Sequence, residues 1–174
     1  ALSEYYSLPD LHDYDQLIRA CGYFTHRYGK IDRFESLNEY LLATEARIRD
    51  DFNIPGIRGG QIDGVKRKSK MKERFESAGI SVAPGRVVPS LQSAREFIQT
   101  TGYPVVAKPD AGVGALDTFR LDGEGDLERF FSAKPHGDYI LEAFVQGSIV
   151  SFDGIADARG ELVFFTSHRF SQGI

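Results

Sequence analysis

The sequence of 174 residues has a single cysteine, Cys21, so it lacks the second thiol that an internal disulfide needs. The absence of disulfides is typical of a reducing compartment, and the cytoplasm is the expected location. No apolar stretch is long enough to span a membrane, and no signal-peptide pattern is present. Positive charge is not in excess, because the formal net charge is −4. No membrane and no nucleic-acid partner is therefore expected, and any polyanion site must be a local pocket.

Several signatures of catalytic and metal sites are also missing. His12, His26 and His136 have no metal-ligand spacing with one another. No Ser-His-Asp arrangement can be argued from the sequence. A glycine-rich segment is present at residues 112–115, but it is not a Walker A motif, because its lysine precedes the glycines and no Gly-Lys-Ser/Thr follows.

The first third of the chain is expected to be helical. Asp13 and Gln16 predict a capping box before a run of helically spaced apolar residues, and Gly29 is placed to end that helix. Ser36 and Glu39 predict a second capping box, which opens another helix.

The rest of the chain begins with an expected turn-rich linker over residues 53–64, followed by a basic helix from near Lys66. Ser90 then caps a helix that stops at Gly102. Short strands are expected at residues 86–88, 105–108, 117–121, 139–144, 149–156 and 161–168, with a short helix at 126–132. The alternation of strands and helices between residues 86 and 144 predicts a small α+β lobe with a mixed or antiparallel sheet.

A cation and a glycine loop come together after the strand over residues 105–108. Lys108 ends this apolar run, and its ammonium can act as a compact charge for phosphate oxygens. The glycines of residues 112–115 allow backbone N–H groups to approach a polyphosphate closely. Taken alone, the same text also fits a glycine turn that joins two strands of a hairpin.

A second group of lysines lies at the start of the basic helix. Positive charges at a helix N-terminus oppose the helix dipole, so they cost stability unless an anion offsets them. Lys68 is the candidate ligand residue of this group. For Lys66, Lys70 and Lys72, a solvated basic face is the simpler interpretation.

A third feature is the apolar strand over residues 139–144, which leads into a glycine turn. Backbone groups at such a strand end can bind an adenine edge, and Phe144 and Val145 supply apolar walls. By itself this stretch also fits a hairpin with a core face.

In this order the features resemble the ATP-grasp superfamily, specifically its carboxylate–amine ligase branch. The resemblance covers roughly residues 60 to 170, and the stretch 36–56 resembles the segment before the grasp fold. It rests on Lys68 ahead of Ala78-Gly79-Ile80, then on residues 103–109, 112–115, 140–147 and 151–154.

The resemblance implies an α/β fold class built of α+β lobes, with a partial ATP-grasp fold preceded by the tail of a Rossmann-like pre-ATP-grasp domain. The expected units are a helical tail at residues 1–58, a linker and first body helix at 59–85, the grasp lid lobe at 86–146 and the start of the C-terminal body at 147–174. A partial body leaves apolar strand edges exposed to pairing, so a homodimer is among the expected assemblies.

The same resemblance implies roles for individual residues. Lys68 and Lys108 would bind the phosphates of ATP. A mobile loop of Gly112, Val113, Gly114 and Ala115 would close over them. The hinge Glu142, Ala143, Phe144 and Val145 would hold adenine through backbone hydrogen bonds.

The sequence departs from the family at the ribose and metal sites. Ile149 stands where many relatives have a glutamate that binds the ribose. Asp153 could take that role, and a turn aspartate in Asp153-Gly154 is the equal alternative. The family's magnesium ligands and its catalytic arginine come later in the chain, so they are expected beyond Ile174 and no metal ligand is assigned here.

The function implied is an ATP-dependent ligase, with ATP and Mg²⁺ as cofactors, that joins a small carboxylate to an amine-type acceptor through an acyl phosphate. The 174 residues alone are expected to bind nucleotide weakly and not to turn it over. The alternative is a non-catalytic nucleotide-binding or protein-interaction module derived from the same fold.

Overall fold

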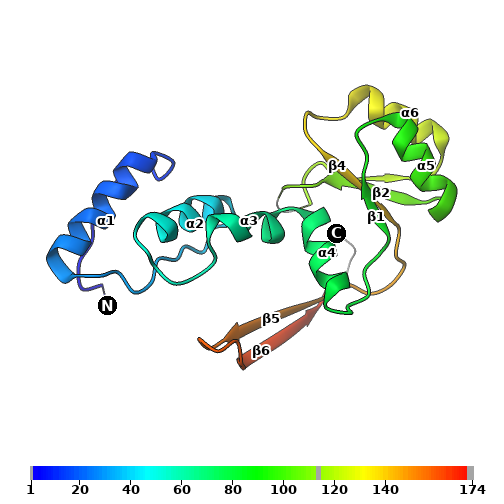
Figure 1. The fold of residues 1–174 in the computed structure, drawn as a ribbon. Helices are drawn as coiled ribbons and strands as arrows, with labels where there is room; N and C mark the ends of the chain where they lie inside the picture. Colours follow the sequence, from blue (N-terminus) through cyan, green and yellow to red (C-terminus); the bar gives the residue numbers. More distant parts are fainter. Residues whose placement is uncertain (1, 113–114, 172–174) are drawn as a thin grey trace.

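The computed structural model describes residues 2–112 and 115–171. Its N-terminal part is helical and lies away from the sheet of the later residues (Figure 1), with a helix α1 at Tyr14–Tyr28, a 3-10 turn η1 at Glu39–Leu41 and a helix α2 at Leu42–Asp51. Helices α3 (Gly59–Lys66) and α4 (Lys68–Ser77) connect it to the rest of the chain. No helix in the described ranges has the length and apolar character needed to cross a membrane.

Helix α1 begins and ends at the residues that the sequence indicates. The Asp13 carboxylate accepts hydrogen bonds from the backbone N–H groups of Asp15 and Gln16, and Gly29 ends the helix with a φ of 86°. The reciprocal half of the predicted capping box is absent, because the Gln16 amide donates to the Asp13 carboxylate instead of accepting from its backbone.

The second predicted capping box is wrong. Asn38 caps the turn η1, with its side chain accepting from the Tyr40 N–H, and helix α2 starts later. The Ser36 N–H donates to the carboxylate of Glu45 at 2.8 Å. Glu45 is buried beside Arg49, so its carboxylate requires hydrogen-bond partners, and the half-buried Ser36 N–H is one of them.

The predicted linker is also wrong in part, because residues 59–66 form helix α3. The two glycines at its start disfavour a helix, but neighbouring side chains stabilise this one. The Gly59 N–H donates to Asp50 at 2.9 Å, and the Arg58 N–H donates to the Gln61 side chain at 3.1 Å. The basic helix begins after a break at Arg67, whose backbone is extended.

An α+β lobe over residues 85–143 carries an antiparallel sheet in the order β1-β4-β2-β3. The strands are β1 (Gly85–Val87), β2 (Val105–Pro109), β3 (Phe119–Leu121) and β4 (Tyr139–Ala143), and the helices are α5 (Leu91–Thr101) and α6 (Glu124–Ala133). This confirms the predicted order of elements and the antiparallel option.

The two faces of this sheet have different roles. Both helices pack on one face, where Val105 and Ala107 of β2 join Tyr139 and Leu141 of β4 in the buried core. Because side chains alternate along a strand, the residues between them point to the opposite face. Lys108 and Glu142 therefore lie on the face that the helices leave uncovered.

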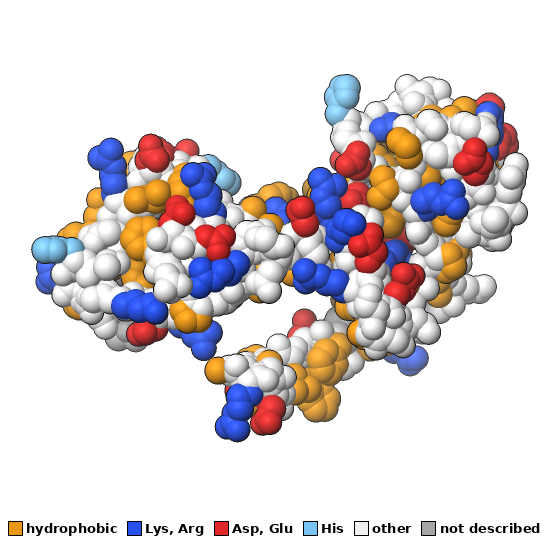
Figure 2. Space-filling model, in the orientation of Figure 1, with side chains coloured by type: hydrophobic (Ala, Val, Ile, Leu, Met, Phe, Trp, Pro, Cys, Tyr) orange, Lys and Arg blue, Asp and Glu red, His pale blue; other side chains and the backbone are white. Residues whose placement is uncertain are grey.

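The last two strands, β5 (Val150–Ala156) and β6 (Leu162–Arg169), form a separate antiparallel hairpin. Most of its apolar side chains are exposed, and Figure 2 shows hydrophobic groups on its surface. Asp153 pairs with Thr166 in the middle of the hairpin, so its interpretation as a turn residue is wrong.

The buried ion pair of the N-terminal helices offers a test of stability. The Arg49 guanidinium contacts Glu45 at 2.9 Å and also donates to the carbonyl oxygens of Phe34 and Ile57. An Arg49→Met variant leaves the Glu45 carboxylate buried and unpaired, so we expect urea unfolding to show a loss of about 3–5 kcal/mol. Arg19→Met, which removes an exposed arginine of α1, should change stability by less than about 0.5 kcal/mol.

Candidate functional site

The candidate site lies between helix α4 and the uncovered face of the sheet. It forms a cavity of about 320 Å³. Lysines, a glutamate and apolar side chains line it: Lys68, Met71, Lys72, Phe75, Val82, Ala83, Lys108 and Glu142. A cavity with apolar walls and a few convergent charges is typical of a small-molecule site.

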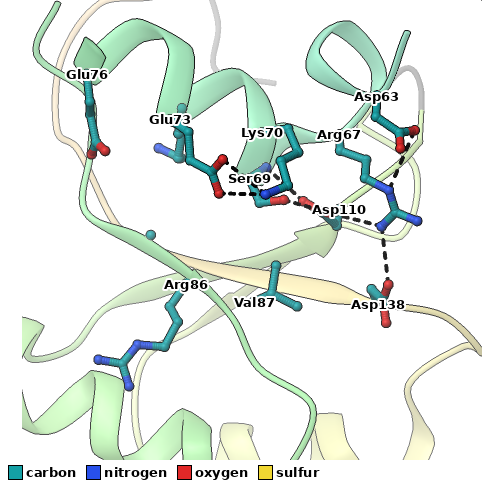
Figure 3. A pocket seen from close by; sticks show the side chains of 12 residues that line it. Asp63, Arg67, Ser69, Lys70, Glu73, Glu76, Arg86, Val87, Asp110 and Asp138 are labelled. Carbon is teal, nitrogen blue, oxygen red and sulfur yellow. Dashed lines mark hydrogen bonds and ion pairs between the residues drawn. The ribbon is translucent and has the colours of Figure 1, made fainter. Parts of the chain in front are cut away.

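Helix α4 is held against the sheet by Asp110, which follows β2 (Figure 3). The buried Asp110 carboxylate accepts from the Ser69 N–H at 2.8 Å and from the Ser69 hydroxyl at 3.0 Å. Its other contact is the Arg67 guanidinium at 3.2 Å, and the Asp110 carbonyl accepts from the Lys68 N–H. The anion that a basic helix start requires is therefore supplied by the chain itself.

Lys68, at the first residue of α4, points toward the end of β2. Its ammonium donates to the carbonyl oxygens of Pro109 at 2.9 Å and Gly112 at 3.2 Å. Burial lowers the pKa of Lys68, and the nearby Lys108 ammonium lowers it further. Two ammonium groups that are close enough to repel each other create a site that favours an anion.

Glu142 lies between two lysines. One carboxylate oxygen is 2.5 Å from the Lys108 ammonium, and the other is 3.2 Å from the Lys72 ammonium. Lys72 also donates to the Ala83 carbonyl at 2.7 Å, and its side chain is only 15% exposed. The prediction of a solvated face is therefore wrong for Lys72, although Lys70 fits it through an exposed pair with Glu73.

Lys72 is the site residue that sequence reasoning missed. The available signal was its spacing, because residues four apart lie on the same face of a helix and Lys68 was already a candidate. A second cavity of about 540 Å³ also borders helix α4, where Ser69, Lys70 and Glu73 line it (Figure 3). Lys72 lines both cavities. Figure 2 shows basic and acidic side chains mixed around these helices.

The predicted hinge, residues 142–145, begins in β4 and continues past the end of this strand. The Ala143 N–H donates to the Pro84 carbonyl at 2.9 Å, and the Phe144 N–H donates to Pro104 at 3.2 Å. Within the ranges that the structure describes, the Val145 N–H makes no hydrogen bond. The Phe144 ring lies under the Arg120 guanidinium, 4.4 Å from its carbon.

The remaining predicted residues divide into three groups. Gly112 joins the site through its carbonyl oxygen, and Ala115 has a left-handed φ of 57°. Val113 and Gly114 lie outside the described residues. Asp153 contacts Ser151 and His168 on the hairpin, and no described hydrogen bond or ion pair links it to the lysines.

Metal ligands are not grouped in the part of the chain that the structure describes. No three histidine, cysteine, aspartate or glutamate side chains there lie close enough together to hold an ion. Asp110 and Glu142 are already engaged by cations of the chain.

Solved structures share this architecture at low sequence identity. An L-amino acid ligase from Bacillus licheniformis superimposes with a TM-score of 0.68 at 18% identity, over 95% of this chain and 39% of that one. The ADP complex of PurK, an N5-carboxyaminoimidazole ribonucleotide synthetase, gives a TM-score of 0.70 at 19% identity, over 92% and 41%. The chain has part of an ATP-grasp fold. This confirms the fold that the motifs predicted.

Curated sequences agree with this ATP-grasp assignment, while no family profile matches the chain. The urea amidolyase of Lachancea kluyveri is 28% identical over 145 residues, which are 78% of this chain. The chain spans only 8% of that protein's length and about two fifths of the two solved chains.

The contacts of Asp110 predict how the candidate site is assembled. Asp110→Ala removes the cap of α4 and leaves Arg67 without its buried partner, so we expect a loss of at least about 2 kcal/mol in urea unfolding. Hydrogen exchange should also show that the Ser69 amide loses protection. Asp122→Ala is the matched control, since its pair with Arg120 is exposed and is worth less than about 1 kcal/mol. Equal losses in both variants would contradict the anchoring role.

Proposed function

We propose that this chain forms the nucleotide-binding part of an ATP-dependent ligase that joins a carboxylate to an amine-type acceptor. The observation that supports this most directly is the convergence of Lys68 and Lys108 on one cavity beside an apolar wall. The fold is shared with an L-amino acid ligase and with PurK. These neighbours, like the curated relatives, are named as enzymes, so they do not favour the non-catalytic alternative.

In this proposal the cations receive the phosphates of ATP. Lys68 and Lys108 act as point charges for phosphate oxygens, and they provide a pre-formed positive site that needs no rearrangement of distant elements. The backbone amides of residues 112–115 complete the phosphate contacts when this loop closes.

The adenine would lie against the hinge formed by Glu142, Ala143, Phe144 and Val145. Among the residues with described positions, the Val145 N–H has no partner and can donate to a ring nitrogen, whereas the Ala143 and Phe144 amides already donate to backbone carbonyls. Met71, Phe75 and Val82 supply the apolar surface. We retain Asp153 as the proposed ribose ligand, which requires the hairpin to approach the site.

The proposed reaction has two steps. A carboxylate oxygen of the substrate attacks the γ-phosphorus, the bond to the β-phosphate oxygen breaks, and ADP leaves with that oxygen's negative charge. The amine then attacks the carbonyl carbon of the acyl phosphate, loses a proton and releases inorganic phosphate. No described residue is assigned to this bond chemistry, and the chain's own lysines serve to bind and orient the phosphates.

The proposed cofactors are ATP and Mg²⁺. One solved neighbour, the biotin carboxylase domain dimer of a 2-oxoglutarate carboxylase from Hydrogenobacter thermophilus, is a complex with MgADP. Bound magnesium would neutralise phosphate charge. The described residues fit the phosphates but not the metal, because no carboxylate cluster is available, so no step here passes through the ion.

We also propose the division of the chain that the motifs suggest, with the helical tail at residues 1–58, a connecting segment at 59–85, the lid lobe at 86–146 and the start of the body at 147–174. The exposed apolar hairpin is consistent with pairing of this last part with further strands or with a second copy.

A binding measurement tests the proposed site. Calorimetry with ATP or ADP and magnesium should show saturable binding, and Lys108→Ala should weaken it about tenfold, which corresponds to about 1.4 kcal/mol. Lys70→Ala is the control, because its ammonium forms an exposed pair outside this cavity. Equal affinity in wild type and Lys108→Ala, or no binding by either, would contradict the proposal.

The pH dependence of this binding should report on Lys68. Its pKa in the free protein is lowered by burial and by Lys108, so the cation that attracts phosphate is lost on raising the pH through that lowered pKa. Nucleotide affinity should therefore fall between neutral pH and about pH 10. In Lys68→Arg the guanidinium stays charged, and the fall should largely disappear. A wild-type affinity that stays constant over this range would contradict the role of Lys68.

A further inference from the structure

Lys72 is more buried and has more contacts at the candidate site than is usual for a lysine on a helix surface. We propose that Lys72 is a positioning residue, which holds one oxygen of Glu142 so that Lys108 is bound by the other oxygen only and keeps its ammonium directed at the ligand. This inference rests on the proposed nucleotide site and deepens it.

The geometry of Glu142 is the first observation. Its carboxylate is buried, and its two oxygens contact two different lysines, Lys72 at 3.2 Å and Lys108 at 2.5 Å. Lys72 is fixed from the other side by the Ala83 carbonyl at 2.7 Å. The Lys72 ammonium is therefore fixed between the Ala83 carbonyl and one oxygen of Glu142. In this position it orients the Glu142 carboxylate, whose other oxygen contacts Lys108.

The backbone next to this pair provides an independent observation. Gly85 of β1 lies opposite Glu142 in the sheet. A Cβ atom at this position would be 3.1 Å from Glu142 Cγ and 3.1 Å from Lys72 Cε. Both distances are shorter than ordinary van der Waals contact, so the missing side chain provides the space in which the two side chains meet.

The charges explain why it matters that the two oxygens of Glu142 contact different lysines. Without Lys72, both oxygens of the buried carboxylate could turn to Lys108 and neutralise it. With Lys72 present, Lys68, Lys72 and Lys108 face a single carboxylate, because Asp110 is engaged by Arg67 and Ser69. The excess positive charge remains available to a polyphosphate.

The role can be separated from a direct contact of Lys72 with the ligand by a double-mutant cycle. We expect Lys72→Met to weaken MgADP binding about tenfold in the wild-type background and less than about twofold when Glu142 is already Gln, because there is no carboxylate left to misplace Lys108. Lys72→Arg should restore affinity to within about threefold of wild type. Lys70→Met, two residues or just over half a turn away along the same helix, is the matched control and should bind like wild type.

A second ligand distinguishes positioning from general damage to the fold. Adenosine has no phosphate for Lys108, so its affinity should be the same in wild type and Lys72→Met. Equal weakening of adenosine and MgADP would overturn the inference, as would a tenfold effect of Lys72→Met that persists in the Glu142→Gln background. Thermal unfolding without ligand should show that Lys72→Met and Glu142→Gln are both folded. If Lys72→Met does not fold, Lys72→Arg is compared with wild type instead.

The outcomes also separate this inference from the proposed function. If Lys72→Met binds MgADP as tightly as the wild type does, the role of Lys72 is overturned and the nucleotide site is left intact. Wild-type protein without measurable binding would overturn the proposed function, and the positioning role with it.

Discussion

The contact between Asp110 and the N-terminus of α4 is the constraint on which the rest of the site depends. It joins the end of β2 to a helix 41 residues earlier in the sequence, through the Ser69 backbone and side chain. Because an α-helix places residues four apart on one face, fixing its first turn also fixes the direction of Lys68 and Lys72. An exposed aspartate could not have this effect, since water would compete for its hydrogen bonds and screen its charge.

The second half of the site follows from the alternation of side chains in the sheet. The pattern that buries Val105 and Ala107 under the helices requires Lys108 to point away from them, and the same rule applied to β4 turns Glu142 to the same face. A shift of one residue in the pairing of β2 with β4 would exchange core and site residues. The apolar core therefore determines where the charged groups meet, and stability and binding depend on the same register.

Local signals in the sequence predicted most of the α+β lobe and much less of the site. Ser90 and Gly102 bound a helix in the structure as they do in the sequence, because caps act over a few residues. The predicted role of Ser36 failed because its N–H binds Glu45, nine residues further along the chain in a buried ion pair. The linker assignment failed because Asp50 and Gln61 stabilise the glycine-rich start of α3. The partner of Lys72 could not be read from helical spacing, since it depends on which strand faces the helix.

The electrostatics of the site connect the stability of its fold to its ability to bind an anion. Burying Lys68 beside Lys108 lowers the pKa of Lys68, which means that the charged form is disfavoured in the empty cavity. Glu142 offsets only part of this repulsion, and the Lys68 ammonium must use the carbonyl oxygens of Pro109 and Gly112 as partners. An anion that binds here gains the attraction of Lys68 and Lys108 and relieves their mutual repulsion. By linkage, whatever binds at this cavity must stabilise the contact between α4 and the sheet, because only the folded arrangement brings these charges together.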